Sequence, residues 1–161
     1  MVDSALYLDS LPVRCRVSGL TVIQSGHDDG EEIEQILMAD RPFCIQVTVE
    51  WLGNAAIALL MLDPTLSVEF VAKPAGIGDK IELATASETM QAPQLAYTPR
   101  LDLNTPHSYG LEAGVYHLNA IIRVGAEAGP AMLCGVYEGI IIEIFNPPQS
   151  ATSRKQSPKH K

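Results

Sequence analysis

The sequence has few of the residues from which catalytic and metal sites are usually assembled. It holds three cysteines and four histidines, and no two cysteines stand close enough for a Cys-x-x-Cys pair. A structural zinc site therefore has no paired ligands from which to start. The sequence also has no Gly-x-Ser-x-Gly turn, no P-loop and no dinucleotide-binding glycine pattern. We expect a protein that is not an enzyme and that needs no metal or other cofactor.

Signals for export or membrane insertion are also missing. Asp3 and Asp9 stand where a signal peptide needs a basic start and an apolar centre. The longest apolar run, 55–62, is much shorter than the about 20 residues that cross a bilayer. The odd, widely spaced cysteines Cys15, Cys44 and Cys134 favour buried thiols in a reducing compartment. We therefore expect a cytoplasmic protein without a membrane partner, although export without a leader would leave no signal here.

The charge is unevenly distributed along the chain. The formal net charge is −8, all 19 acidic residues precede residue 144, and four of the 11 basic residues follow residue 153. An acidic body repels phosphate backbones, so nucleic acid is excluded as a partner of the folded part. The tail 147–161 is rich in Pro, Ser and Lys and almost lacks apolar residues, which predicts a disordered basic segment.

What the sequence does contain is a strong alternation of apolar and polar residues with a period of two. In 43–51 the apolar row runs from Phe43 through Ile45, Val47 and Val49 to Trp51. The stretch 66–73 repeats the pattern, and Pro74 and Gly76 end it. Both stretches predict strands with one buried face.

Further strands are expected on both sides of this pair. The stretches 79–86 and 115–124 are candidates, and Pro99 confines 96–103 to a sheet edge or a bulge. The stretch 135–145 is apolar on both faces. Counting inward from its end places Val136, Glu138, Ile140, Ile142 and Ile144 on one face. The stretch 13–24 predicts either two strands or one bent strand.

Two stretches leave the type of element open. The stretch 28–39 fits a helix or a strand, and we favour the strand because its neighbours are strands. The stretch 54–63 predicts a short crossing helix or loop, since Ala and Leu favour helix. We expect three parts: an N-terminal strand segment with an acidic loop, 1–29, packed on the same domain; the core, 30–146; and the tail, 147–161.

About seven to eight short strands without long helices between them predict an all-β, antiparallel sandwich. Within it, the stretch "LEAGVYHL" resembles the tyrosine corner of immunoglobulin-like and fibronectin-type-III-like sandwiches. The resemblance implies that Leu111 packs under the corner, Gly114 makes the turn, and the Tyr116 hydroxyl bonds to the backbone upstream. Leu118 stands where antibody-type domains have their second bridging cysteine, so the resemblance implies no disulfide between the sheets.

A row of polar residues marks one candidate surface. His117, Asn119 and Arg123 alternate with the apolar row of their strand, so they should share its other face, interrupted by Ile121. Glu143 on the next strand is a possible partner for Arg123. Such a row is either a recognition surface or simply the solvated side of a half-buried sheet.

Apolar residues mark a second candidate surface. Ile140 and Ile141 in the last strand, with Leu59 and Leu60 in the crossing segment, exceed what one face of a sandwich needs. Excess apolar surface indicates contact with another chain, while the alternative is that the crossing segment plugs the sandwich end.

The function that we predict is a non-enzymatic interaction or structural module that binds a protein partner or itself. The alternative is a small-ligand or carbohydrate-binding sandwich with a concave, partly aromatic site at the loops 125–134 and 76–79. A hydrolase or transferase would need His107 or His117 to meet an acid and a nucleophile in a pocket.

Overall fold

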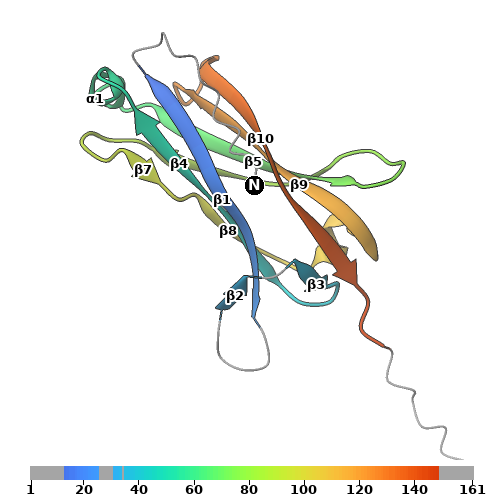
Figure 1. The fold of residues 1–161 in the computed structure, drawn as a ribbon. Coiled ribbons are helices and arrows are strands. Elements are labelled where there is room, and N and C mark those ends of the chain that lie inside the picture. Colours follow the sequence, from blue (N-terminus) through green and yellow to red (C-terminus); the bar gives the residue numbers. More distant parts are fainter. Residues whose placement is uncertain (1–12, 26–30, 34, 149–161) are drawn as a thin grey trace, which may run out of the picture.

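The computed structural model describes residues 13–25, 31–33 and 35–148, which form two facing β-sheets (Figure 1). Sheet A has the order β2-β1-β4-β7, with β8 also on β4, and sheet B the order β3-β10-β9-β5-β6. Every pairing is antiparallel except that of β3 with β10. The strands of sheet A are β1 (Arg14–Ser25), β2 (Glu31–Ile33), β4 (Phe43–Leu52), β7 (Ala96–Tyr97) and β8 (Arg100–Leu103). Those of sheet B are β3 (Ile36–Met38), β5 (Thr65–Pro74), β6 (Ile81–Thr89), β9 (Gly114–Gly125) and β10 (Ala131–Phe145).

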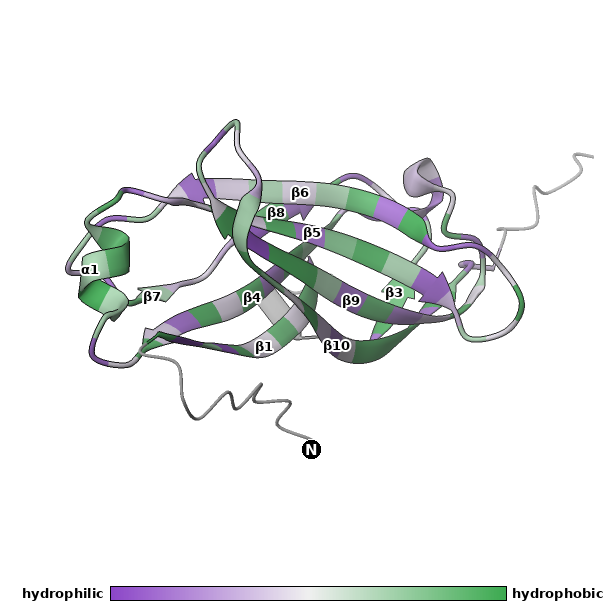
Figure 2. Cartoon of the chain, turned by 90° about the horizontal axis from the view of Figure 1, so that it is seen from above, coloured by the Kyte–Doolittle hydropathy of each residue, from purple (hydrophilic) through white to green (hydrophobic). Residues whose placement is uncertain are grey.

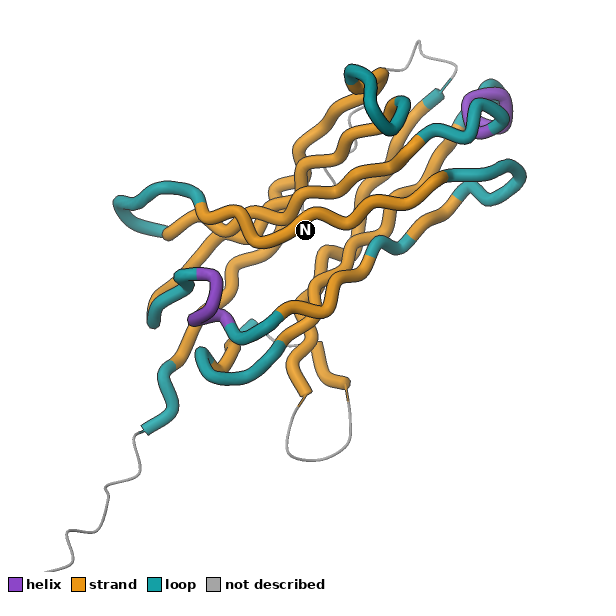
Figure 3. The backbone as a smooth tube through the Cα atoms, turned by 180° about the vertical axis from the view of Figure 1, so that it is seen from behind, coloured by secondary structure: helices purple, strands orange, loops and turns teal. Residues whose placement is uncertain are grey.

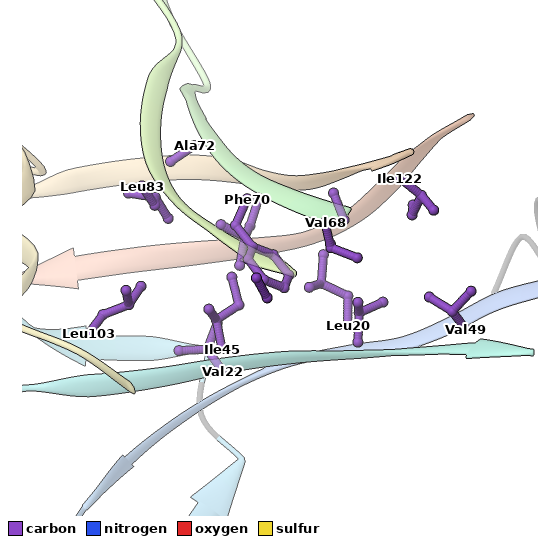
Figure 4. Packing of buried hydrophobic residues seen from close by; sticks show 14 of the residues in the cluster. Leu20, Val22, Ile45, Val49, Val68, Phe70, Ala72, Leu83, Leu103 and Ile122 are labelled. Atoms are coloured by element: carbon purple, nitrogen blue, oxygen red, sulfur yellow. The ribbon is translucent and has the colours of Figure 1, made fainter. Parts of the chain in front are cut away.

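The prediction of an all-β sandwich is confirmed, with more strands in the described ranges than the sequence suggested. The predicted apolar rows of β4 and β5 face each other across the core. Ile45, Val47 and Val49 on β4 and Val68 and Phe70 on β5 are each 0% exposed. Figure 4 shows Val68 and Phe70 above Ile45 and Val22, with the gap filled by interdigitating side chains. Burial of these rows is the main stabilising contribution to the sandwich.

The first described strand, β1, is one bent strand rather than two. Its register with β4 shifts between Ser18 and Thr21, and Gly19 between them has φ of +64°. Only glycine adopts this backbone conformation without strain, so Gly19 permits the bulge. Because β1 pairs with β4 on both sides of the bulge, it is an integral part of sheet A.

The stretch 28–39, over its described residues, forms strands, as we favoured. The chain leaves sheet A after β2, joins sheet B as β3 and returns to sheet A as β4. Gln24, a buried polar side chain, holds this crossing in place. Its Oε1 accepts from the Met38 N–H at 2.7 Å, and its Nε2 donates to the carbonyls of Met38 and Arg41 at 3.1 and 3.0 Å.

Short elements complete the ends of the sandwich. The crossing segment forms α1 (Ala56–Leu60), a single helical turn that buries Ala56 and Leu60 in the core. Pro99 lies between β7 and β8, which both pair with β4 at the edge of sheet A, as its lack of an N–H predicts. The 3-10 helix η1 (Pro106–Tyr109) leads toward β9. No helix among the described residues is both long and apolar enough to cross a membrane.

The predicted facing of β10 is wrong in its first half. A register shift between Glu138 and Ile140 reverses the alternation, so Val136 is 59% exposed while Ile142 and Ile144 are buried. Leu133 and Tyr137 pack against the core instead, while Ile140 faces the core with Ile142 and Ile144, as predicted. The cause is a bulge at Gly139, a single residue that simple counting from the strand end cannot detect.

Two contacts define the bulge at Gly139. A Cβ atom at this position would collide with the Leu20 side chain of β1 and would lie 2.6 Å from the Leu118 carbonyl oxygen. The Gly139 N–H donates to the Asn119 Oδ1 at 3.4 Å. Gly139 therefore lets an edge of sheet A approach sheet B, and Asn119 gives the displaced N–H a partner.

The corner before β9 has the geometry that the resemblance implied. The Tyr116 hydroxyl donates to the Glu112 carbonyl at 3.0 Å, and Leu111 beneath it is 0% exposed. Gly114 is the first residue of β9. The corner thus ties the start of β9 to the loop that precedes it.

We expect Gly139→Ala to lower the free energy of unfolding by about 1–3 kcal/mol, because the added methyl overpacks a closed contact. Chemical denaturation monitored by tryptophan fluorescence measures the change. Gly76→Ala is the matched control, since a Cβ there meets nothing within 4 Å. Equal stability of the two variants would show that Leu20 does not pack on Gly139.

We expect Tyr116→Phe to lower the free energy of unfolding by about 1 kcal/mol, a typical contribution of one hydrogen bond. Tyr109→Phe serves as the control, because the Tyr109 hydroxyl accepts only a long, exposed bond from the Asn104 N–H at 3.4 Å. The same denaturation measurement compares the two. A Tyr116→Phe variant as stable as the parent protein would contradict the structural role of the corner.

Candidate functional site

The polar and apolar candidates meet on the outer face of sheet B, the side away from sheet A. Strand register brings Cys134, Arg123 and Ser67 into one row, and Ile141, His117 and Lys73 into another. His117, Asn119, Arg123 and Ile141 therefore share one surface. We call this surface the outer face; it is formed by β10, β9 and β5, which lie side by side in Figure 2.

Two of the three polar candidates already have partners within the sheet. Arg123 Nη1 lies 3.3 Å from Glu69 Oε2 on β5. The suggested pairing with Glu143 is wrong, because Glu143 stands opposite Val115, which is eight residues along β9 from Arg123. Since Arg123 is about half exposed, its ion pair stabilises the fold little. Asn119 supports the Gly139 bulge. His117 is exposed and takes part in neither of these two contacts.

Exposed apolar side chains gather on the part of the outer face that β10 forms with the adjoining residues of β3 and β9. Six of the exposed large hydrophobic residues occupy this region, and we call them the apolar strip. They are Ile36 (57% exposed), Val115 (43%), Met132 (55%), Val136 (59%), Ile141 (53%) and Phe145 (44%). Exposed apolar side chains gathered on one face are typical of a contact surface. Of the six, only Ile141 was among the predicted surface residues, and for Val136 the reason is the bulge, which reverses its facing.

The other predicted apolar candidates do not belong to this surface. Leu60 is 0% exposed, and Leu59 and Ile140 pack against the core. The crossing segment thus plugs the sandwich end with Leu60, which was the stated alternative. It still presents Met61 and Leu62 to solvent, at 72% and 68% exposure.

The apolar strip adjoins a strand edge without a partner in the described chain. β9 pairs with one edge of β10, and β3 pairs with the other edge only from Glu143 to Phe145. Among the described residues no strand pairs with the rest of that edge. In Figure 3 the two short helices, drawn in purple, lie at opposite ends of the sandwich. Between 131 and 142 the sequence has no Lys, Arg or Pro, the residues that commonly protect sheet edges.

A shallow hollow of about 310 Å³ lies at one end of the outer face, beside the loop 125–131. Arg123 and Glu127 flank it, and Thr65, Ser67 and Ser87 contribute hydroxyl groups. The predicted ligand site at this loop was to be partly aromatic, but the lining of the hollow has no aromatic residue. The hollow therefore differs from the site that the sequence suggested.

The three free cysteines have three different environments. Cys44 is buried, and burial raises the pKa of the partly buried Cys15 thiol to about 11. Cys134 is exposed on the outer face, so the prediction of buried thiols is wrong for this residue.

Among the described residues no group of three or more His, Cys, Asp and Glu side chains could hold a metal ion. The candidate His107 lies on η1, away from the β9 row that holds His117.

Comparison with known proteins does not assign this chain to a family. No family model matches the sequence, and no curated protein does. A solved structure of a β-glucosidase from Listeria innocua with glucose is 12% identical, with a TM-score of 0.42, over 82% of this chain and 16% of the glucosidase. AggA, the major subunit of aggregative adherence fimbriae type I from Escherichia coli, is 12% identical, with a TM-score of 0.40, over 83% of this chain and 95% of AggA. Likenesses at this level carry no argument about function.

We expect a thiol reagent at pH 8 to modify one cysteine rapidly in dilute native protein, and that cysteine to be Cys134. At this pH a thiol with a pKa of about 11 is almost entirely protonated, and the thiolate is the reactive form, so Cys15 should react slowly. Absorbance of the released chromophore gives the number of fast thiols. Cys134→Ser should remove the fast phase and Cys15→Ser should leave it, while the reverse result would contradict the assignment.

Proposed function

We propose that this chain is a non-enzymatic interaction or structural module that associates with itself through the apolar strip and the adjoining edge of β10. The observation that carries the proposal is the coincidence of these two features on one strand. Val136 and Met132 are more than half exposed on the same strand whose backbone edge has no strand partner among the described residues over 131–142. Apolar area and unsatisfied backbone groups are the two things that a partner strand covers at once.

The charge pattern supports a contact at this place rather than elsewhere. The chain carries a net charge of −8, so two copies repel each other over most of their surfaces. Glu138 is the only charged residue between 131 and 142. This stretch of β10 is therefore a surface that two acidic copies can bring together with little electrostatic cost.

We also propose a cytoplasmic location, which the three free thiols support. A second candidate function, small-ligand binding, is supported by the hollow beside the loop 125–131. Thermal-shift measurements with sugars and divalent ions separate the two functions, since a ligand stabilises only a protein that binds it. Stabilisation by such a ligand in a strictly monomeric protein would favour the second candidate.

We expect Val136→Lys to weaken self-association roughly tenfold or more, because a buried ammonium group in the contact costs more than the about 1.4 kcal/mol that corresponds to this factor. Sedimentation velocity or light scattering over a concentration series measures the dissociation constant. Ile77→Lys is the matched control, since Ile77 is fully exposed in the loop between β5 and β6 and lies outside the strip. A parent protein that stays monomeric at high micromolar concentration would contradict the proposal.

A further inference from the structure

The straight first part of β10 offers a self-complementary edge. Two register shifts bound this part of β10, one between Ala131 and Leu133 and one at the Gly139 bulge, and from Leu133 to Glu138 the pairing with β9 is regular. Side chains on the outer face in this part are Met132, Cys134 and Val136, followed by Glu138. This short segment decides how a second copy can pair.

Symmetry limits the possible registers of such a pair. Two copies related by a two-fold axis perpendicular to the sheet join as antiparallel strands and keep their outer faces on the same side. Opposed residues must then both point outward or both point inward. One residue of the strand must consequently stand opposite its equivalent in the second copy. Most of the segment 131–138 takes part in the pairing only when this central residue is Cys134 or Gly135.

The side chains distinguish these two centres. With Gly135 at the centre, Glu138 stands opposite Met132 of the second copy, and a carboxylate is placed among apolar groups. With Cys134 at the centre, Met132 of each copy stands opposite Val136 of the other copy, and Glu138 lies outside the paired segment. Apolar cross-strand pairs stabilise a sheet, so the second arrangement is favoured.

We propose that two copies of this chain join their B sheets into one continuous sheet by antiparallel pairing of β10 with β10, with Cys134 opposite Cys134. The inference rests on the proposed self-association and adds its register. Because the pairing is a closed two-fold contact that uses the same edge of both copies, it produces dimers and leaves no β10 edge for a third copy. The outer faces of the two copies then form one surface, with the apolar strips adjoining across the axis.

Site-directed cross-linking tests the register. In a background with Cys15→Ser, Cys44→Ala and Cys134→Ser, single cysteines are introduced as Met132→Cys or Val136→Cys, both at exposed positions. The proposed register predicts that copper phenanthroline in air links the two variants only when they are mixed. Cys134 retained as the only cysteine should link to its own copy. Circular dichroism melting curves confirm that each variant is folded.

The outcomes separate the register from the self-association itself. Dimers in light scattering with a link between Cys134 and Val136→Cys would establish the other centre and overturn the inference while the proposed function stands. Dimers without any link among these positions would overturn it as well, and would place the contact elsewhere. Monomers at every concentration would overturn both. The expected result is efficient linking of Met132→Cys to Val136→Cys and of Cys134 to its own copy, both at rates well above that of Ile77→Cys controls.

Discussion

The close approach of Leu20 to Gly139 is the contact on which the arrangement of the candidate site depends. It brings β1 of sheet A against β10 of sheet B, and it is possible only because residue 139 has no Cβ. The same glycine forms the bulge that reverses the facing of β10. One packing contact therefore closes the core on this side and sends Met132 and Val136 outward rather than inward. Without the bulge, these side chains would face the core, and Leu133 and Tyr137 would face outward in their place.

Much of the fold follows from local patterns, and the candidate site does not. The alternation in β4 and β5 identifies their buried rows because each strand is regular along those residues, and Pro99 marks a sheet edge because it lacks an N–H. The stretch "LEAGVYHL" indicated the corner at Tyr116 for a similar reason, since its bond to Glu112 is local. These features are determined by residues within a few positions of one another.

The surface residues depend on contacts between distant parts of the chain. The bulge decides whether Val136 or Tyr137 faces solvent, and its contacts with Leu20 and Asn119 come from residues that are distant in sequence. The same is true of Arg123, whose partner Glu69 lies on a strand that is adjacent in space only. Leu60 was predicted at the surface and is buried. The composition of a short apolar run does not tell whether it covers the core or contacts a partner. Gly139 interrupts a stretch that is rich in β-branched residues, and a glycine in such a place could have indicated the bulge.

The crossing of the chain between the two sheets has a consequence for the order of folding. β3 belongs to sheet B, but its only strand partner in the described chain is the end of β10, where Ile36 stands opposite Glu143. During synthesis β3 emerges early and must wait for the last strand before it can pair. The segment that Gln24 fastens to β1 is thus completed late, and long-range pairing of this kind slows folding. Until β10 is available, the apolar side chains that it covers in the folded protein stay exposed, so the nascent chain is more prone to aggregation than the finished one.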